Sequence, residues 1–346
     1  MKTIDTQILK IKQIERDTAK IERAAAVLRQ GGLVAMPTET VYGLAANALD
    51  EAAVRAVFAA KGRPADNPLI VHISDRTWIA RLALACPTTA NALMDAFFPG
   101  PLTIILKKSP LVPDAVTCGM DTVAIRMPVH PVARALIDAC GFPLAAPSAN
   151  RSGSPSPTTA QHVLADMDGR IGCILDGGPC TVGVESTVLS LAGDTPRLLR
   201  PGFVTPEEIE AVIGPIAIDE AVTERLPEGV AARSPGMKYK HYAPKTRVIL
   251  IDGPLDRFAG WVEEHHAENP IALCFDGDET YIPAPCVNYG RENCPEQQAR
   301  QLFAALREVD AYGAGVCYAR MPQKTGVALS VYNRMLRAAA FEVIVL

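Results

Sequence analysis

Two cations one residue apart, Lys61 and Arg63, are the side chains of this sequence best suited to gripping an anion. They flank Gly62, and glycine readily takes the left-handed backbone that ends a helix. The apolar segment 51–60 is expected to be that helix. Both cations would then leave its end on a bent backbone and could point at one spot. The alternative is a solvated pair at a helix C-terminus, where positive charge is weakly favoured.

Further cations and small hydroxyl groups stand at the ends of predicted strands. Arginine is favoured where a planar fork grips a carboxylate or a phosphate. If these side chains converged with Lys61 and Arg63, the pocket would suit several anions at once, such as a triphosphate and a carboxylate. The residues are Thr40, Arg126, Ser148, Ser186 and Arg200.

Several familiar catalytic patterns are missing from the sequence. It contains no Gly-x-x-x-x-Gly-Lys-Ser/Thr, so a nucleotide would not be bound by a P-loop. It also contains no Gly-x-Ser-x-Gly and no convincing Ser/His/Asp arrangement. We therefore expect a site that holds and orients two reactants, in which positioning and charge neutralisation carry a group transfer.

Composition narrows the class of protein. A chain of 346 residues should form more than one domain, and a net charge of −4 argues against a surface built for nucleic acid. Nine cysteines without a Cys-x-x-Cys pair indicate reduced thiols, and six histidines without ligand spacing predict no protein-held metal site. No apolar run approaches a membrane span or a signal peptide, so the expected location is cytoplasmic with no membrane partner.

The elements that must position these side chains alternate between helix and strand, which predicts an α/β fold. We expect a first domain over residues 18–205, a linker over 206–245 and a smaller doubly wound α/β domain over 246–346. The last of these contains Gly313-Ala314-Gly315 but no full Gly-x-Gly-x-x-Gly after its first strand. A nicotinamide or flavin cofactor is therefore not expected.

The segment 234–244, Ser-Pro-Gly-Met-Lys-Tyr-Lys-His-Tyr-Ala-Pro, is unusual for a linker. It is too polar for a core element and too aromatic for an inert spacer. Its lysines, tyrosines and histidine can donate hydrogen bonds, and tyrosine can stack on a base. We expect it to fold over the active site and to exclude water.

Four motifs together resemble the long form of the threonylcarbamoyl-AMP synthases. They are Lys61-x-Arg63, Ser148-x-Asn150, and the segments 37–43 and 234–244. The resemblance covers residue 18 to the end. It implies a YrdC-like domain, an open twisted α/β sheet around a basic cavity, followed by a linker and a smaller Rossmann-like α/β domain.

The resemblance also implies a reaction. Members of this family condense L-threonine, bicarbonate and ATP into threonylcarbamoyl-adenylate and release pyrophosphate, with Mg²⁺ accompanying the triphosphate. The product feeds the threonylcarbamoyl modification of the adenosine beside the anticodon, through a downstream tRNA threonylcarbamoyl transferase complex. Neither bond-forming step needs a protein nucleophile, in agreement with the missing patterns.

Site residues carry over from the resemblance by position. The implied catalytic set is Lys61, Arg63, Ser148 and Asn150. The implied ATP-binding set is Lys61, Arg63, Asn67, Thr122, Ser148, Asn150, Thr158, Arg200 and Tyr239. The implied threonine-binding set is Thr40, His72, Arg126, Ser148 and Ser186. For His72 a plain core histidine is an equal alternative, because it lies within an apolar strand.

Two other functions remain open from the sequence. One is nucleic-acid binding, including weak binding of tRNA in a basic cavity, although the acidic net charge counts against it. The other is an enzyme that uses a different amine or carbamoyl substrate in the same cavity. The sequence leaves the role of the C-terminal domain and the oligomeric state undetermined.

Overall fold

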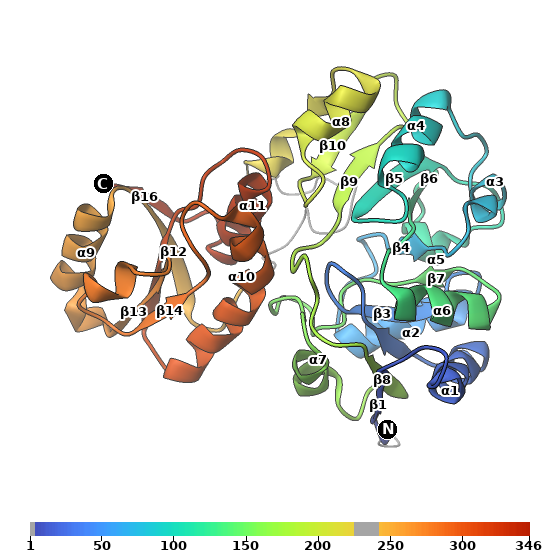
Figure 1. Cartoon of the computed structure of the whole chain (residues 1–346), viewed down its shortest axis with the longest axis horizontal. Coiled ribbons are helices and arrows are strands. Elements are labelled where there is room, and N and C mark those ends of the chain that lie inside the picture. Colours follow the sequence, from blue (N-terminus) through green and yellow to red (C-terminus); the bar gives the residue numbers. More distant parts are fainter. Residues whose placement is uncertain (1–3, 225–241) are drawn as a thin grey trace.

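The structure is a computed structural model that describes residues 4–224 and 242–346. Two α/β units lie side by side, one built on an 11-stranded mixed sheet and the other on a five-stranded sheet (Figure 1). The expected α/β class and the expected pair of units are both confirmed. Tyr239 and most of the segment 234–244 lie outside the described residues.

The larger sheet mixes parallel and antiparallel pairs. Strands β4 and β6 run parallel, whereas β5 and β6 run antiparallel. In spatial order its strands are β1 (Gln7–Lys10), β8 (Cys173–Asp176), β2 (Val34–Met36), β3 (Gly43–Asn47), β7 (Leu144–Ala145), β4 (Ile70–His72), β6 (Thr122–Arg126), β5 (Leu102–Lys107), β9 (Thr187–Ser190), β10 (Arg197–Arg200) and β11 (Ala217–Ile218).

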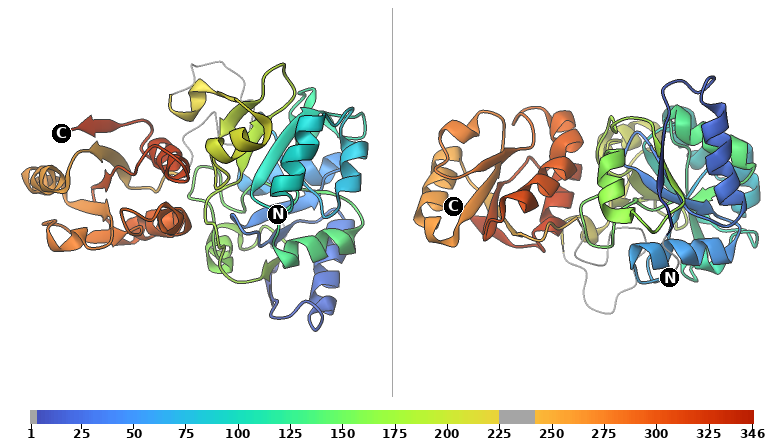
Figure 2. Two further views of the ribbon diagram at one scale, coloured as in Figure 1. Left: turned by 45° about the horizontal axis from the view of Figure 1, so that its top comes forward. Right: turned by 90° about the horizontal axis from the view of Figure 1, so that it is seen from below.

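Helices cover both faces of this sheet (Figure 2). In β2, Ala35 joins the core under one face, while Val34 and Met36 join the core under the other, as the period of a strand requires. The helices are α1 (Thr18–Arg29), α2 (Glu51–Lys61), α3 (Ile79–Leu82), α4 (Thr88–Phe97), α5 (Asp114–Thr117), α6 (Pro131–Cys140), α7 (Ala160–Met167) and α8 (Pro206–Ile213), with short 3₁₀ turns η1 (Arg76–Trp78) and η2 (Glu220–Val222).

Helix α2 carries the two neighbouring cations and follows from local sequence. The side chain of Asp50 caps its first turn by accepting from the backbone N–H groups of Ala52 and Ala53. Gly62 ends the helix at φ +62°, in the left-handed conformation predicted for it. Both ends of α2 are therefore determined by the residues next to them, Asp50 at the start and Gly62 at the end.

The smaller unit is a parallel sheet with helices on both sides. Parallel strands are normally covered on both faces, and α10 and α11 form the layer that faces the larger unit (Figures 1 and 2). In spatial order its strands are β14 (Cys286–Asn288), β13 (Pro270–Cys274), β15 (Val316–Arg320), β12 (Arg247–Asp252) and β16 (Val343–Val345). Its helices are α9 (Leu255–Glu264), α10 (Pro295–Val309) and α11 (Ala328–Ala338), with turns η3 (His266–Glu268), η4 (Asp278–Thr280) and η5 (Asp310–Tyr312).

The larger unit extends past both predicted boundaries, 18 and 205. Strand β1 pairs with β8 at one edge of the sheet, and β11 pairs with β10 at the other. Helix α8 also belongs to this unit, because Ile209 is fully buried in its main core. The expected linker from residue 206 therefore begins inside the larger unit and not after it.

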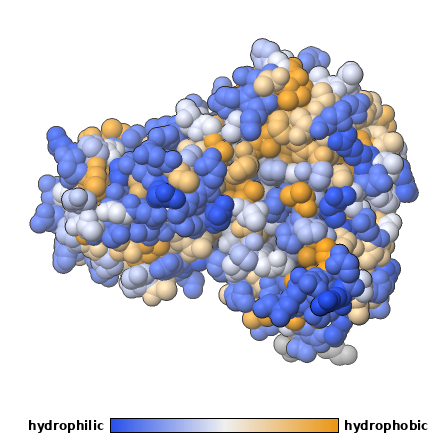
Figure 3. Space-filling model, in the orientation of Figure 1, coloured by the Kyte–Doolittle hydropathy of each residue, from blue (hydrophilic) through white to orange (hydrophobic). Residues whose placement is uncertain are grey.

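The outer surface of the smaller unit is largely hydrophilic in the view of Figure 3. No helix within residues 4–224 or 242–346 combines the length and the apolar character that a membrane crossing requires.

Candidate functional site

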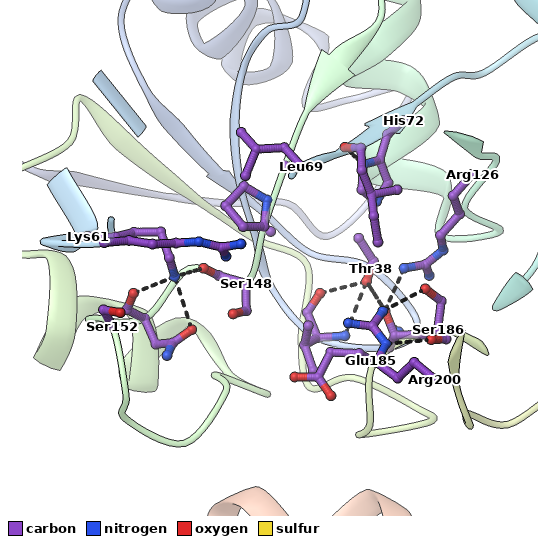
Figure 4. A pocket seen from close by; sticks show the side chains of 18 of the residues that line it. Thr38, Lys61, Leu69, His72, Arg126, Ser148, Ser152, Glu185, Ser186 and Arg200 are labelled. Carbon is purple, nitrogen blue, oxygen red and sulfur yellow. Dashed lines mark hydrogen bonds between the residues drawn. The ribbon is translucent and has the colours of Figure 1, made fainter. Parts of the chain in front are cut away.

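A cavity opens in the larger unit where loops and strand ends from distant parts of the chain meet. The space that its walls outline, open solvent included, is about 750 Å³. Figure 4 shows Lys61, Ser148 and Ser152 on one side, and Thr38, Arg126, Glu185, Ser186 and Arg200 on the other. The predicted residues that line it are Thr40, Lys61, Arg63, His72, Arg126, Ser148, Asn150, Ser186 and Arg200. The expected convergence of cations and hydroxyl groups is thus present.

Three predicted ATP-binding residues do not line this cavity. Thr122 starts β6 whereas Arg126 ends it, and the four residue steps between them span about 13 Å of strand. Thr122 lines a different hollow, with Arg197. Thr158 contacts the ring of His162, and Asn67 is buried with its carbonyl oxygen accepting from Arg63. Tyr239 lies outside the described residues.

Lys61 is buried, with 4% of its surface exposed, and is not the solvated helix-end cation that local sequence allows. Its Nζ donates to the carbonyl oxygens of Ser148 and Asn150, the latter at 2.7 Å, and to Asn150 Oδ1 at 3.3 Å. The loop 148–150 therefore closes over the end of α2. Burial, followed by the charge of Arg63, lowers the pKa of Lys61 well below its usual range.

Arg63 is partly buried beside Lys61. Its Nη2 donates to the carbonyl oxygen of Asn67 at 2.8 Å, and its guanidinium lies 5.8 Å from the ring centroid of Phe58. Burial lowers the pKa of Arg63 to about 10, so the guanidinium remains charged at neutral pH. This side of the cavity therefore places the Lys61 amine beside the charged guanidinium of Arg63.

Arg126 organises the opposite side of the cavity. Its Nη1 donates to Thr40 Oγ1 at 2.8 Å, and its Nη2 forms an ion pair with Glu39 at 2.7 Å. The Thr38 and Thr40 hydroxyl groups are themselves 2.8 Å apart. The loop 38–40 after β2 is thereby held against the end of β6, as a ligand-binding loop at the end of a strand would be.

His72 lies beside Arg126, because the two residues are register partners in β4 and β6. Its Nδ1 lies 3.1 Å from the carbonyl oxygen of Ile70, which can only accept, so Nδ1 carries the proton. Burial, then the charge of Arg126, lowers the pKa of His72 to about 3. The ring is neutral at physiological pH and leaves Nε2 as an acceptor.

Arg200 and Ser186 complete this side of the cavity. Arg200 Nε donates to the carbonyl oxygen of Ser186 at 3.0 Å, and its Nη2 donates to Ser186 Oγ at 3.2 Å. Ser186 Oγ also lies 2.7 Å from Thr103 Oγ1. Burial lowers the pKa of Arg200. These bonds join the start of β9 to the end of β10.

Among the lining residues that were absent from the predicted binding sets, Glu185 and Tyr242 contribute most to the chemistry of the cavity. Glu185 precedes Ser186, and an acidic residue within the apolar run 182–191 was a signal that could have identified it. Tyr242 belongs to the segment 234–244, and its buried ring lines the cavity while the N–H of Ala243 donates to the Gly153 carbonyl oxygen at 3.0 Å. The described end of that segment therefore reaches the site.

Comparison with known proteins identifies the family. A family model described as "Telomere recombination" matches residues 26–202, and one described as "Threonylcarbamoyl-AMP synthase, C-terminal domain" matches residues 204–340. A threonylcarbamoyl-AMP synthase of Pyrococcus abyssi is 47% identical, over 94% of this chain and 95% of its own length. The chain belongs to the threonylcarbamoyl-AMP synthase family.

Other members agree with this membership. A threonylcarbamoyl-AMP synthase of Bacillus subtilis is 46% identical, over 96% of each chain. The crystal structure of P. abyssi Sua5 complexed with L-threonine superposes with a TM-score of 0.90 at 44% identity, covering 99% of both chains. The two-unit architecture is therefore shared with a solved member of the synthase family, and the resemblance found in the sequence is confirmed.

The chemistry available to this member of the family is that of binding and orientation. The cavity offers four basic side chains at two sides, hydroxyl groups between them and one neutral histidine. Among the described residues, no group of three or more His, Cys, Asp or Glu could hold a metal ion.

Proposed function

We propose that this chain is a threonylcarbamoyl-AMP synthase, which condenses L-threonine, bicarbonate and ATP into threonylcarbamoyl-adenylate and releases pyrophosphate. The observation that supports this most strongly is the single cavity that gathers Lys61, Arg63, Arg126 and Arg200. Glu39 pairs with Arg126, and Arg334 of α11 pairs with Glu185, so these two carboxylates leave basic side chains in the cavity whose charge an entering anion would balance. A triphosphate and an amino-acid carboxylate satisfy both sides.

Each side of the cavity would bind a different substrate. Lys61 and Arg63, with Ser148 and Asn150, would hold the phosphates of ATP and neutralise charge at the reacting α-phosphate. Arg126 would pair with the carboxylate of threonine, for which a guanidinium fork is suited. The neighbouring Thr40, His72 and Ser186 would bind its amine and hydroxyl groups. Mg²⁺ would enter as part of the ATP substrate.

The reaction then follows from positioning. The amine of threonine attacks the carbon of bicarbonate, a carbon–oxygen bond breaks, and that oxygen leaves as water with a proton from the amine, which gives a carbamate. With CO₂ derived from bicarbonate, the attack opens one C=O double bond and the amine releases a proton. A carbamate oxygen attacks the α-phosphate, the bond between the α-phosphate and the bridging oxygen breaks, and pyrophosphate leaves. Because His72 is neutral, its Nε2 can accept a hydrogen bond from the amine or the hydroxyl group of threonine. Tyr242 would help to exclude water from the carbamate.

This reaction would be the first step of the threonylcarbamoyl modification of tRNA. A separate transferase complex would then transfer the threonylcarbamoyl group from the adenylate to tRNA. We place the reaction in the cytoplasm. All nine cysteines are free thiols in the structure, as is usual in a reducing compartment.

The test is pyrophosphate release from ATP with each substrate omitted in turn. Release should require both L-threonine and bicarbonate, and mass spectrometry should detect threonylcarbamoyl-adenylate. L-Serine, which lacks only the methyl group, is the matched control for substrate choice. Equal release with serine, or without any amino acid, would contradict the substrate assignment.

A further inference from the structure

The wall of the cavity between residues 181 and 186 is held from two sides. Toward the cavity, the N–H groups of Val182 and Gly183 donate to the carbonyl oxygens of Glu39 at 2.8 Å and Thr40 at 3.1 Å. Toward the smaller unit, the Thr181 carbonyl oxygen accepts from Arg300 Nε of α10 at 3.0 Å. One strip of backbone thus separates the C-terminal unit from the site.

Arg334 of α11 reaches the same strip and is fully buried, with 0% of its surface exposed. Its Nε donates to Glu185 Oε2 at 2.9 Å, and its Nη2 donates to the Glu185 carbonyl oxygen at 3.2 Å. Its Nη1 donates to the carbonyl oxygen of Pro201, which follows Arg200, at 2.6 Å. One guanidinium from the C-terminal unit therefore binds both strand ends that carry Ser186 and Arg200.

The partner of Arg334 is an acid on the wall of an anion-binding cavity. Glu185 lines the cavity beside Ser186 (Figure 4), and its Oε1 accepts from Ser156 Oγ at 2.5 Å. Burial opposes the ionisation of this carboxyl group, but the charges of Arg334 and then Arg200 outweigh burial and lower its pKa. Glu185 is therefore a carboxylate, and its charge must be balanced if phosphates are to bind nearby.

We propose that Arg334 is a positioning residue that neutralises Glu185, so that the cations of the cavity remain directed at the nucleotide. The C-terminal unit would then contribute to the anion affinity of a site whose lining, within the described residues, comes from the larger unit and Tyr242. This inference rests on the proposed function, because it takes ATP as the anion. Without Arg334, a buried carboxylate would repel phosphate and compete for Arg200.

The experiment measures binding of α,β-methylene ATP to the full-length chain by calorimetry, because this analogue cannot be cleaved at the reacting bond. Arg334→Met should weaken binding at least about tenfold, since it leaves a buried charge without its partner. The double variant Glu185→Gln with Arg334→Met removes both charges and should bind within about threefold of the wild type. A purely structural role for Arg334 would not be rescued by a second substitution.

Arg307→Met is the matched control. Arg307 of α10 forms an ion pair with Asp166 of α7 at 2.6 Å across the same two units, but Asp166 does not line the cavity. This variant also leaves a carboxylate without its partner, but that carboxylate lies outside the cavity wall, so the variant should bind the analogue within about threefold of the wild type.

Each outcome decides the proposal. Equal weakening by Arg334→Met and Arg307→Met would overturn it, as would a folded double variant that binds no better than Arg334→Met. If Arg334→Met fails to fold, the double variant decides alone: tight binding supports charge neutralisation and weak binding contradicts it. A wild-type chain that does not bind the analogue would instead refute the proposed function.

Discussion

At the residue scale, Lys61 combines the proposed contact to a phosphate with a buried structural role. Lys61→Met and Arg63→Met should each cost at least about 2 kcal/mol of transition-state stabilisation, as expected for a charge-assisted contact to a reacting phosphate. Lys61→Met should also lower the free energy of unfolding by about 1–3 kcal/mol, because the buried Asn150 carbonyl loses its donor. Steady-state kcat/KM and thermal unfolding of both variants check this.

The comparison between these two variants is informative, because Arg63 is only partly buried and should affect folding less. Unchanged kcat/KM in both would exclude them from the reaction. An effect on unfolding alone would make Lys61 a structural lysine that ties α2 to the loop 148–150.

His72 should make the protein sensitive to acid. Its folded-state pKa of about 3 lies below the ordinary value of 6.5, so the unfolded chain binds a proton first as the pH falls. The stability linked to this neutral ring is fully present above pH 6.5 and is lost on acidification by up to about 1.4 kcal/mol per pH unit, until about pH 3. Urea unfolding at pH 7, 6 and 5 measures it.

His72→Asn should show a shallower decline over the same range, because asparagine does not titrate. His130 and His162 titrate in both proteins, so the difference between the two curves isolates His72. Parallel curves would show that His72 is not held neutral by burial.

At the scale of elements, the packing of α10 against residues 181–186 leaves no room for a side chain at Gly183. A Cβ there would lie 2.4 Å from Arg300 Cα and 2.5 Å from the carbonyl oxygen of Ala299. Gly183→Ala should therefore move α10 away and lower the free energy of unfolding by about 2–4 kcal/mol, through overpacking and backbone strain together.

Gly178→Ala is the matched control for that substitution. Gly178 has φ +91° against φ +86° at Gly183, but nothing lies within 4 Å of an added Cβ. Gly178→Ala should lower the free energy of unfolding by about 1–2 kcal/mol, through backbone strain alone. The difference between the two variants in the free energy of chemical unfolding therefore measures the contact of residue 183 with α10. If the two variants were equally destabilised, α10 would accommodate the added methyl group at residue 183 without an energetic cost.

At the scale of the whole molecule, one apolar cluster spans both units. It includes Val182, Val184 and Val222 of the larger unit together with Phe303 and Leu306 of α10. Removing the smaller unit would expose these valines and leave Glu185 without Arg334. The two units should therefore unfold as a single cooperative transition.

Two truncations test this arrangement. A chain ending at residue 224 keeps all strands of the larger sheet and should fold, with a lower melting temperature and much weaker ATP binding than the full chain. A chain ending at residue 205 loses α8 and β11, uncovers the core around Ile209 and should be insoluble or unfolded. Circular dichroism and pyrophosphate release measure both. Full activity of the shorter chain would contradict the boundary seen in the structure.

Local signals in the sequence determined the elements that carry much of the site. The helix expected over residues 51–60 is observed as α2 (Glu51–Lys61), because apolar periodicity and Pro/Gly punctuation are properties of neighbouring residues. The same holds for Gly62, whose backbone conformation follows from its lack of a Cβ. Because the helix end at Gly62 could be predicted, Lys61 and Arg63 could be identified from the sequence as candidate anion-binding residues.

Only the tertiary structure decided which strand ends meet and which charges are buried. Thr122 and Arg126 stand at opposite ends of one strand, and the direction of β6 within the sheet brings only Arg126 to the cavity. Lys61 resembles a solvated cation until the loop 148–150 covers it. The pairing of Glu185 with Arg334 joins residues 149 positions apart. Such contacts depend on how whole faces pack together, and no local periodicity encodes that packing.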